Sequence, residues 1–379
     1  MALVLTEEQE LLKQSASEFL NDKSPVTHLR EMRDTEDVVG FSRALWREMA
    51  ELGWPGIIFP EEYGGAEMGY AELGILLEES GRRLSPYPLL STVVLGGSAL
   101  MEGGSEEQRA KVLPGVCRGE TLLALAFQES GRFDPYFTEC TASASGSGYS
   151  ISGDKIFVLD GHVADQLIVV ARTAGEVNDR DGLTLFLVAS DFEGLSISRT
   201  VMVDSRNAAN ISFRNLQVEA AQVLGKVDAG ADILDVVFDC ATAVLCAEML
   251  GISCEVFERT IEHLKTRQQF GVPIGSFQGL KHRAAEMFCE IELSKSVVLD
   301  ALRAIDEGRP DVSRVVSAAK ARVSDTVGLV TREGIQMYGG IGMTDEEEVG
   351  LFLKRAKAAE LMFGDASFHR NRFASLLGF

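Results

Sequence analysis

Arg267 and Phe270 stand three residues apart where a long apolar helical run ends, in the segment Arg267–Gln278. A guanidinium has the planar, forked donors that grip a diphosphate, and a phenylalanine beside it can pack on a purine ring. Gly271 predicts the end of the helix, and Pro273 keeps the helix from resuming. The spacing therefore predicts a shaped corner between two antiparallel helices. It is either a site for a ligand with a diphosphate and a purine, or an ordinary corner with a surface arginine.

This segment resembles the Arg-x-x-Phe-Gly…Phe-Gln signature of the acyl-CoA dehydrogenase family, and Gln336–Gly342 continues the same signature. The resemblance covers essentially the whole chain. It implies FAD as the cofactor, with the two motifs reaching a neighbouring subunit's FAD. Arg267 would pair with the pyrophosphate and Phe270 would lie near the adenine. The residues that the resemblance assigns to the FAD groove are Arg267, Phe270, Gln278, Gln336, Gly339 and Gly340.

Desaturation of an acyl thioester needs a carboxylate that takes a proton from the α-carbon while the flavin takes a hydride. The resemblance places this base at Phe363 in most of the family and at Ala241 in a minority, and neither side chain can move a proton. The catalytic base is therefore unassigned. Asp365 is the first candidate to replace it, and Asp239 and Glu248 in the apolar helix are the others.

Two positions on the flavin side also depart from the family. The usual Thr-Glu-Pro is Gln128-Glu129-Ser130 here, and the usual Trp-Ile-Thr is Phe157-Val158-Leu159. Two hydroxyl partners of the flavin are thereby lost, which argues against a complete flavin pocket in this chain's own cleft.

The combination of a missing base and intact Arg267-type motifs is similar to one subunit of the heterotetrameric acyl-CoA dehydrogenases of steroid side-chain catabolism. The resemblance implies a chain that completes the FAD site of a homologous catalytic subunit, with an acyl-CoA substrate and an electron-transfer flavoprotein as electron acceptor. Two alternatives stay open. One is a self-sufficient homotetramer that uses Asp365, and the other is a non-enzymatic acyl-CoA-binding or scaffold homologue.

The elements that must position these residues change along the chain. Helical periodicity over residues 1–120, short β-rich runs over 121–226 and long apolar helices over 227–379 predict three domains. The resemblance agrees: a helical N-terminal domain, a middle β barrel or sandwich, and a C-terminal four-helix bundle. The long helices are predicted at Ala231–Arg267, Gln278–Glu307, Val312–Tyr338 and about Glu346–Leu377. Strands are predicted at Leu122–Phe127, Tyr149–Ile151, Lys155–Leu159, Leu167–Ala171, Leu183–Val188, Leu195–Arg199 and Ala209–Phe213.

Composition narrows the classes of partner. A net charge of −21 over 379 residues argues against nucleic acid and against an anionic membrane surface. An anionic CoA ester would need local basic groups, for which Arg82-Arg83, Lys265 with Arg267, and Lys281-His282-Arg283 are candidates. No run of about 18 apolar residues predicts a membrane span. The six cysteines and five histidines show no disulfide or metal-ligand spacing, so we expect a cytoplasmic protein without a metal site.

Overall fold

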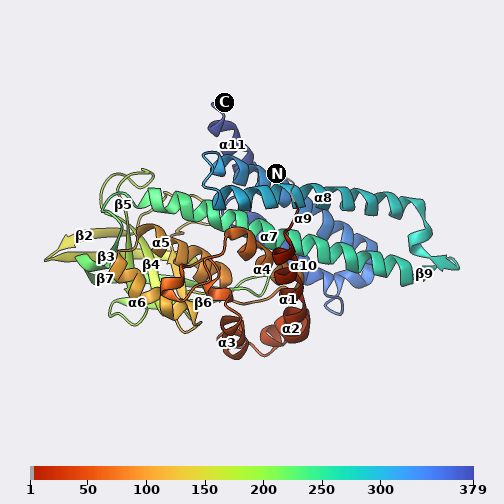
Figure 1. Cartoon of the computed structure of the whole chain (residues 1–379), viewed down its shortest axis with the longest axis horizontal. Coiled ribbons are helices and arrows are strands. Elements are labelled where there is room, and N and C mark those ends of the chain that lie inside the picture. The colour runs from red at the N-terminus through yellow and green to blue at the C-terminus, as the bar shows by residue number, and fades with distance from the viewer. Residues whose placement is uncertain (1–3) are drawn as a thin grey trace. The chain divides into compact units, whose positions relative to one another are not determined.

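The chain forms two compact units in the computed structural model, which describes residues 4–379 (Figure 1). The helical unit comprises the residues up to Glu31, Tyr70–Ser85 and Thr242–Phe379. The sheet unit comprises Met32–Gly69 and Pro86–Ala241. The predicted boundaries at residues 120 and 226 stay a prediction. No helix among residues 4–379 is long and apolar enough to span a membrane.

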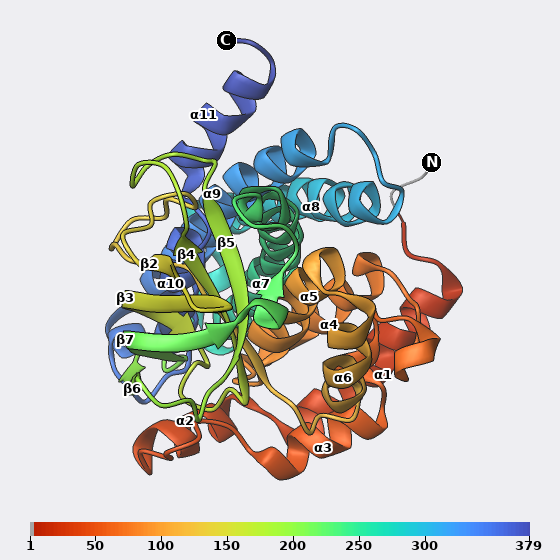
Figure 2. The ribbon, with the colours of Figure 1, turned by 90° about the vertical axis from the view of Figure 1, so that its left-hand side faces the viewer.

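The sheet unit is built on eight strands in the order β6-β7-β3-β2-β4-β5-β8, with β1 paired in parallel to β4 (Figure 2). Its core is formed by the inward side chains of these strands, among them Ile151, Leu167 and Phe213. The strands are β1 (Leu123–Ala126), β2 (Thr141–Ser145), β3 (Gly148–Leu159), β4 (Gln166–Arg172), β5 (Leu183–Ala189), β6 (Leu195–Val201), β7 (Asn207–Glu219) and β8 (Val223–Leu224).

All seven predicted strands are present, but two of them were wrongly separated. Tyr149–Ile151 and Lys155–Leu159 both lie in β3, whose register against β7 shifts after Ile151 and after Lys155. The sequence also missed β2, because Thr141–Ser145 contains no large apolar residue and pairs only by its position next to β3.

The shorter helices are α2 (Val26–Asp34), α3 (Arg43–Glu51), α5 (Ser98–Gly103) and α6 (Glu106–Cys117). Apolar periodicity predicts a single helix over about Leu89–Glu102. In the structure Leu89–Gly97 forms π-helical turns that continue into α5, and all of Leu89–Gly97 is buried. Ser105 begins α6 with a capping box to Gln108, as Thr6 begins α1 with one to Gln9.

The helical unit contains α1 (Glu7–Lys23), α4 (Tyr70–Arg83), α8 (Gln278–Asp306), α9 (Val312–Tyr338), α10 (Val349–Leu361) and α11 (Ala366–Leu376), together with most of α7 (Gly230–Thr266). The prediction of one last helix over Glu346–Leu377 was wrong. Phe363 and Gly364 have φ of 56° and 96°, which ends α10 and starts a separate α11.

Helices α4 and α7 cross with their backbones in close approach. A Cβ atom at Gly81 would stand 2.2 Å from the Glu248 carbonyl oxygen, and one at Gly251 would stand 1.9 Å from the Glu78 carbonyl oxygen. Both distances are far below a normal contact. The crossing therefore requires glycine on each helix at the point where it meets the other.

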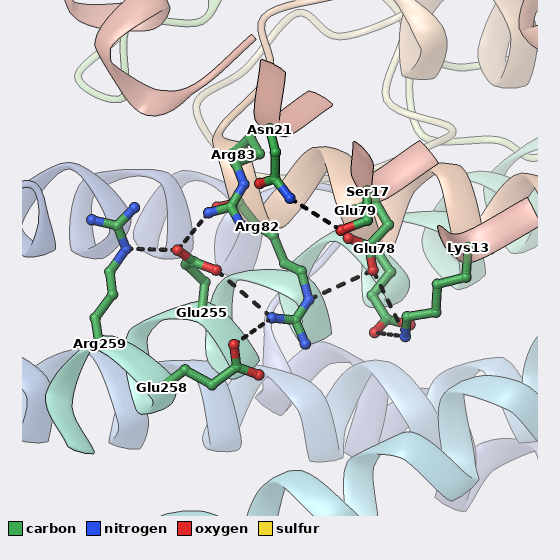
Figure 3. A network of polar contacts seen from close by, with 10 residues as sticks. All are labelled: Lys13, Ser17, Asn21, Glu78, Glu79, Arg82, Arg83, Glu255, Glu258 and Arg259. Carbon is green, nitrogen blue, oxygen red and sulfur yellow. Dashed lines mark hydrogen bonds and ion pairs between the residues drawn. The ribbon is translucent and has the colours of Figure 1, made fainter. Parts of the chain in front are cut away.

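A network of ion pairs joins α1, α4 and α7 beside this crossing (Figure 3). Glu255 lies at its centre: its carboxylate is 2.5 Å from Arg83, 2.7 Å from Arg259 and 3.7 Å from Arg82. Glu258 also accepts from Arg82, at 3.0 Å. Arg82 and Arg83, predicted as candidates for offsetting a CoA ester, are thus both engaged by glutamates of the chain itself.

We expect Glu255→Ala to lower the free energy of unfolding of the helical unit by about 3 kcal/mol, because it removes a buried carboxylate and leaves three partly buried arginines without their common partner. The Glu255 side chain is only 7% exposed. Glu258, at 59% exposure, provides the matched control, and Glu258→Ala should cost less than about 1 kcal/mol. Urea denaturation followed by circular dichroism measures both, and equal losses would contradict the central role of Glu255.

Candidate functional site

The corner that carries Arg267 is a two-stranded hairpin beyond the end of α7 (Figure 1). Strand β9 (Gln268–Gln269) pairs with β10 (Val272–Pro273), and Phe270 and Gly271 form the turn with φ of 54° and 79°. Two central residues of positive φ are what a tight hairpin of this twist requires. The predicted corner is confirmed, but as a hairpin and not as a simple helix stop.

Phe270 is 92% exposed at the tip of this hairpin. Its ring is in edge contact with that of Phe277, at 6.1 Å between centroids. Arg267 and Gln278 are exposed as well. The helical unit thus offers an arginine, two phenylalanines and an amide to something outside its own core.

The second motif lies beside the first. The His263 ring, in the last turn of α7, stacks on Tyr338 at the end of α9 with centroids 4.2 Å apart. The Tyr338 hydroxyl donates to the Arg259 carbonyl oxygen at 3.2 Å. Gln336, Gly339 and Gly340 follow on this same end of α9 and are exposed. The fold therefore brings the two sequence motifs to one end of the helix bundle.

Two glycines, one directly after the first motif and one in the second, are not required by the fold of the chain. Gly279 and Gly340 lack a positive φ, and a Cβ atom at either would meet nothing within 4 Å. Glycine at an open, unstrained position allows a ligand's anionic group to approach backbone N–H groups closely. Together with the exposed guanidinium of Arg267, these residues fit the pyrophosphate and adenine of a dinucleotide such as FAD.

The flavin-side positions in the sheet unit have different surroundings. Gln128 uses its side-chain amide to donate to the Ser130 carbonyl oxygen at 2.9 Å, and its own carbonyl accepts from Ile156 N–H at 2.8 Å. Phe157 has φ of 52° and is 42% exposed. These two positions therefore lie next to each other. Neither carries a hydroxyl that could hydrogen-bond a flavin, as the resemblance would imply.

The loop that carries Gln128 is fixed by a buried ion pair that sequence reasoning missed. Lys155, fully buried, donates to Glu129 at 2.5 Å and to the Phe127 carbonyl oxygen at 3.1 Å. Glu129 also accepts from the backbone N–H groups of Glu139 and Cys140. The sequence signal was a lysine directly before the apolar run Ile156–Leu159.

Both positions of the expected base are apolar and buried. Phe363 is 3% exposed and Ala241 is 0% exposed. The turn at Phe363 is held by its surroundings. Lys320, fully buried on α9, donates to the carbonyl oxygens of Glu360 and Gly364 at 2.9 Å, and burial lowers the pKa of Lys320 to about 8. Sequence reasoning missed this lysine, since its role depends on contacts across the bundle.

Of the three carboxylates considered as substitutes, two have structural partners and the third is buried. Asp365 is the N-cap of α11 and accepts from Phe368 N–H at 2.8 Å. Glu248 pairs with Arg355 at 3.1 Å inside the helical unit. Asp239 is buried in α7. Among residues 4–379, the structure contains no group of His, Cys, Asp or Glu that could hold a metal ion.

Asp365→Asn separates capping from proton transfer, because asparagine caps a helix as well as aspartate does but cannot act as a base. We expect Asp365→Asn to leave the free energy of unfolding nearly unchanged. The activity of the assembled enzyme should stay within about twofold of the wild type. Asp365→Ala, which removes the cap, should cost about 1 kcal/mol of stability. A loss of activity in the asparagine variant at unchanged flavin content would instead identify Asp365 as the base.

His369 should make the helical unit sensitive to acid. Its Nε2 donates to the Phe363 carbonyl oxygen at 2.8 Å, and burial lowers the pKa of His369 to about 3. Between pH 6.5 and 3 the unfolded chain therefore binds one proton more than the folded chain. The free energy of unfolding should therefore decrease as the pH is lowered through this window, by up to about 1.4 kcal/mol per pH unit. Urea midpoints at pH 7 and pH 5 should differ less in His369→Gln, and an equal difference would refute the assignment.

Three family models match the chain along most of its length. Residues 6–120 match the N-terminal domain of acyl-CoA dehydrogenases, 128–216 the middle domain and 228–377 the C-terminal domain. Among curated relatives, the mitochondrial isovaleryl-CoA dehydrogenase of Pongo abelii is 29% identical over 378 residues, covering 97% of this chain and 88% of that protein.

Solved structures extend the comparison to the fold. The Tcur3481-Tcur3483 steroid ACAD is 32% identical with a TM-score of 0.87, covering 98% of each chain. The ChsE4-ChsE5 complex of Mycobacterium tuberculosis is 25% identical with a TM-score of 0.87, covering 100% of this chain and 99% of that one. PigA with FAD and proline is 25% identical with a TM-score of 0.91 and the same coverage.

Proposed function

Because the chain belongs to the acyl-CoA dehydrogenase family of FAD-dependent oxidoreductases, we propose that it is the completing subunit of a hetero-oligomeric acyl-CoA dehydrogenase. A homologous partner would supply the catalytic base, and this chain would supply part of the partner's FAD site. The observation that carries the proposal is the contrast between two buried apolar residues at the base positions and an exposed, intact cofactor corner.

Each exposed residue of the corner has a defined part in this proposal. The Arg267 guanidinium pairs with the FAD pyrophosphate, and the Phe270 ring packs near the adenine. The glycines let backbone N–H groups approach the anion. Bound FAD supplies the hydride acceptor for desaturation of the thioester. The residues that line the groove beside Arg267 and Phe270 are Gln278, Gln336, Gly339 and Gly340.

We propose that Phe363 and Ala241 are the reason why this chain needs a partner that supplies the catalytic base. A phenylalanine ring and a methyl group neither accept a proton nor polarise a carbonyl, so the α-carbon of a thioester near them would keep its proton. Asp365 caps a helix and Glu248 is paired with Arg355, which argues against either of them as a replacement base. The partner's carboxylate must then do this work.

We further propose a bulky CoA thioester such as a steroid side chain as the substrate, and steroid catabolism as the setting. Similarity to the Tcur3481-Tcur3483 steroid ACAD, and to the ChsE4-ChsE5 complex as a two-protein assembly, supports this choice. An electron-transfer flavoprotein is the proposed electron acceptor. A cytoplasmic location fits six cysteines that form no disulfide with one another, five of them buried.

The test is the flavin-to-protein ratio of the chain purified alone and co-purified with its partner. Little flavin alone, rising to about one flavin per two chains in the complex, supports the proposal. One flavin per chain without a partner, bleached by an acyl-CoA, would favour the self-sufficient homotetramer. Absence of flavin from every assembly would favour the non-enzymatic reading.

A further inference from the structure

The segment Gln128–Cys140, called the strap here, is fastened at both of its ends within the sheet unit. Glu129 at its start is the buried partner of Lys155. The same carboxylate accepts from Glu139 N–H at 2.6 Å and from Cys140 N–H at 3.1 Å at the strap's end. One carboxylate thereby closes the segment into a loop whose middle is free to contact other elements.

The middle of the strap packs on the first turns of α7 through three phenylalanines. The Phe133 ring lies 5.2 Å from Phe238 of α7 and 6.2 Å from Phe127, and Phe127 lies 4.7 Å from Phe238, all in edge contact. Phe127 and Phe238 are buried at 8% and 6% exposure, whereas Phe133 is half-buried. Phe133 is therefore the outer ring that covers the other two.

A polar clasp one turn earlier on α7 holds the strap in the same position. The Tyr136 hydroxyl donates to Asp235 at 2.6 Å. Arg180 donates to Asp235 at 2.7 Å and to Asp232 at 2.6 Å. Burial raises the pKa of Tyr136 to about 12, so the hydroxyl keeps its proton and remains a donor. Asp235 and Phe238 are three residues apart and lie on one face of the helix.

Within the sheet unit, the strap runs from a position that the resemblance assigns to the flavin side towards one of the expected base positions. It begins at Gln128, whose carbonyl binds the N–H next to Phe157, and it covers Phe238, three residues before Ala241. We propose that Phe133 and Tyr136 hold the strap shut on α7 and so exclude CoA thioesters from this chain's own site. This inference rests on the proposed function and adds a second reason, beyond the missing base, for a silent site.

The ring contacts of the strap indicate that it closes the site and does not line it for a ligand. A wall for an aromatic or polycyclic ligand would present ring faces to the ligand, but here the rings use their edges and faces on one another. The clasp at Tyr136 also satisfies its own polar groups internally. A thioester could enter only after Phe133 leaves Phe238, so its apparent affinity is reduced by the small fraction of open strap.

The test is calorimetric titration of isovaleryl-CoA into the full-length assembly purified through this chain. Phe133→Ala should open an additional thioester site on each copy of this chain, with affinity roughly 10–100-fold above that of the wild-type site. Tyr136→Phe, which keeps every ring and removes only the clasp, should give a smaller gain of roughly tenfold. Phe192→Ala is the matched control, because Phe192 is a 37% exposed phenylalanine of the same unit outside the strap.

Each outcome decides. New binding in the two strap variants and none in the control supports the inference. A thioester bound to each copy of this chain in the wild type, beyond the one in each partner subunit, overturns it, and so does no gain in either folded variant. Should Phe133→Ala lose its circular dichroism signal, Tyr136→Phe and faster trypsin cleavage at Arg132 carry the test. Flavin content judges the proposed function separately. One flavin per copy of this chain, with thioester binding that still depends on Phe133, would overturn the proposed function but not the inference about the strap.

Discussion

Arg267→Ala should release most of the FAD from the hetero-oligomer. Arg267 is exposed at the base of the hairpin, and charge-assisted hydrogen bonds to a pyrophosphate contribute about 1.5–3 kcal/mol each. Losing them should weaken FAD binding roughly 10–150-fold. The measurement is the flavin absorbance of the purified complex, followed by FAD titration of the apo-complex to obtain its Kd.

Lys265→Ala provides the control for the change in charge. Lys265 ends the same helix and is 63% exposed, but it pairs with Glu262 at 2.6 Å and lies outside the motif. We expect its flavin content to match that of the wild type. Full FAD occupancy in Arg267→Ala, or equal losses in both variants, would show that Arg267 does not bind the pyrophosphate.

Glu248→Ala should be the most damaging single substitution in the helical unit. Glu248 and Arg355 are 2% and 1% exposed and lie 3.1 Å apart, between α7 and α10. Removing one partner leaves an uncompensated charge in the interior, which costs about 3–5 kcal/mol. Thermal and urea unfolding of the variant should show this loss, with secondary structure at low temperature unchanged.

Two further variants identify the cause. Lys357→Ala on α10 removes a 59% exposed lysine and should change stability by less than about 0.5 kcal/mol. Replacing both buried partners, as Glu248→Leu with Arg355→Met, should recover most of the stability because no charge then remains buried. A double variant as unstable as Glu248→Ala would assign the loss to packing instead of charge.

The sequence predicted the elements that signal themselves locally. The bounds of α8 and α9 agree with prediction to within one residue. Errors arose where tertiary contacts decide. Residues Thr141–Ser145 form a strand only because they lie beside β3. The break between α10 and α11 depends on a positive φ at Phe363, which cannot be predicted from a phenylalanine in the sequence.

The candidate site divides in the same way. The hairpin corner could be predicted because glycine and proline mark it and a signature accompanies it. The roles of Lys320, Glu129 and Lys155 could not, since each depends on a partner 26 to 44 residues away in the chain. A buried lysine looks like a surface lysine in sequence until the fold supplies its carbonyl or carboxylate partners.

The crossing of α4 and α7 bears on how relatives of this chain should be read. At Gly81 and Gly251 any larger residue would meet a main-chain oxygen of the opposite helix, and no side-chain change elsewhere can move that atom away. The fold therefore requires glycine at these two positions whatever the chemistry of the site. A paralogue that has lost its chemistry should retain both glycines as faithfully as an active enzyme does. Glycines shared at these positions then indicate a common fold. Activity must be judged from the residues that relatives carry at the positions of Phe363 and Ala241 and around them.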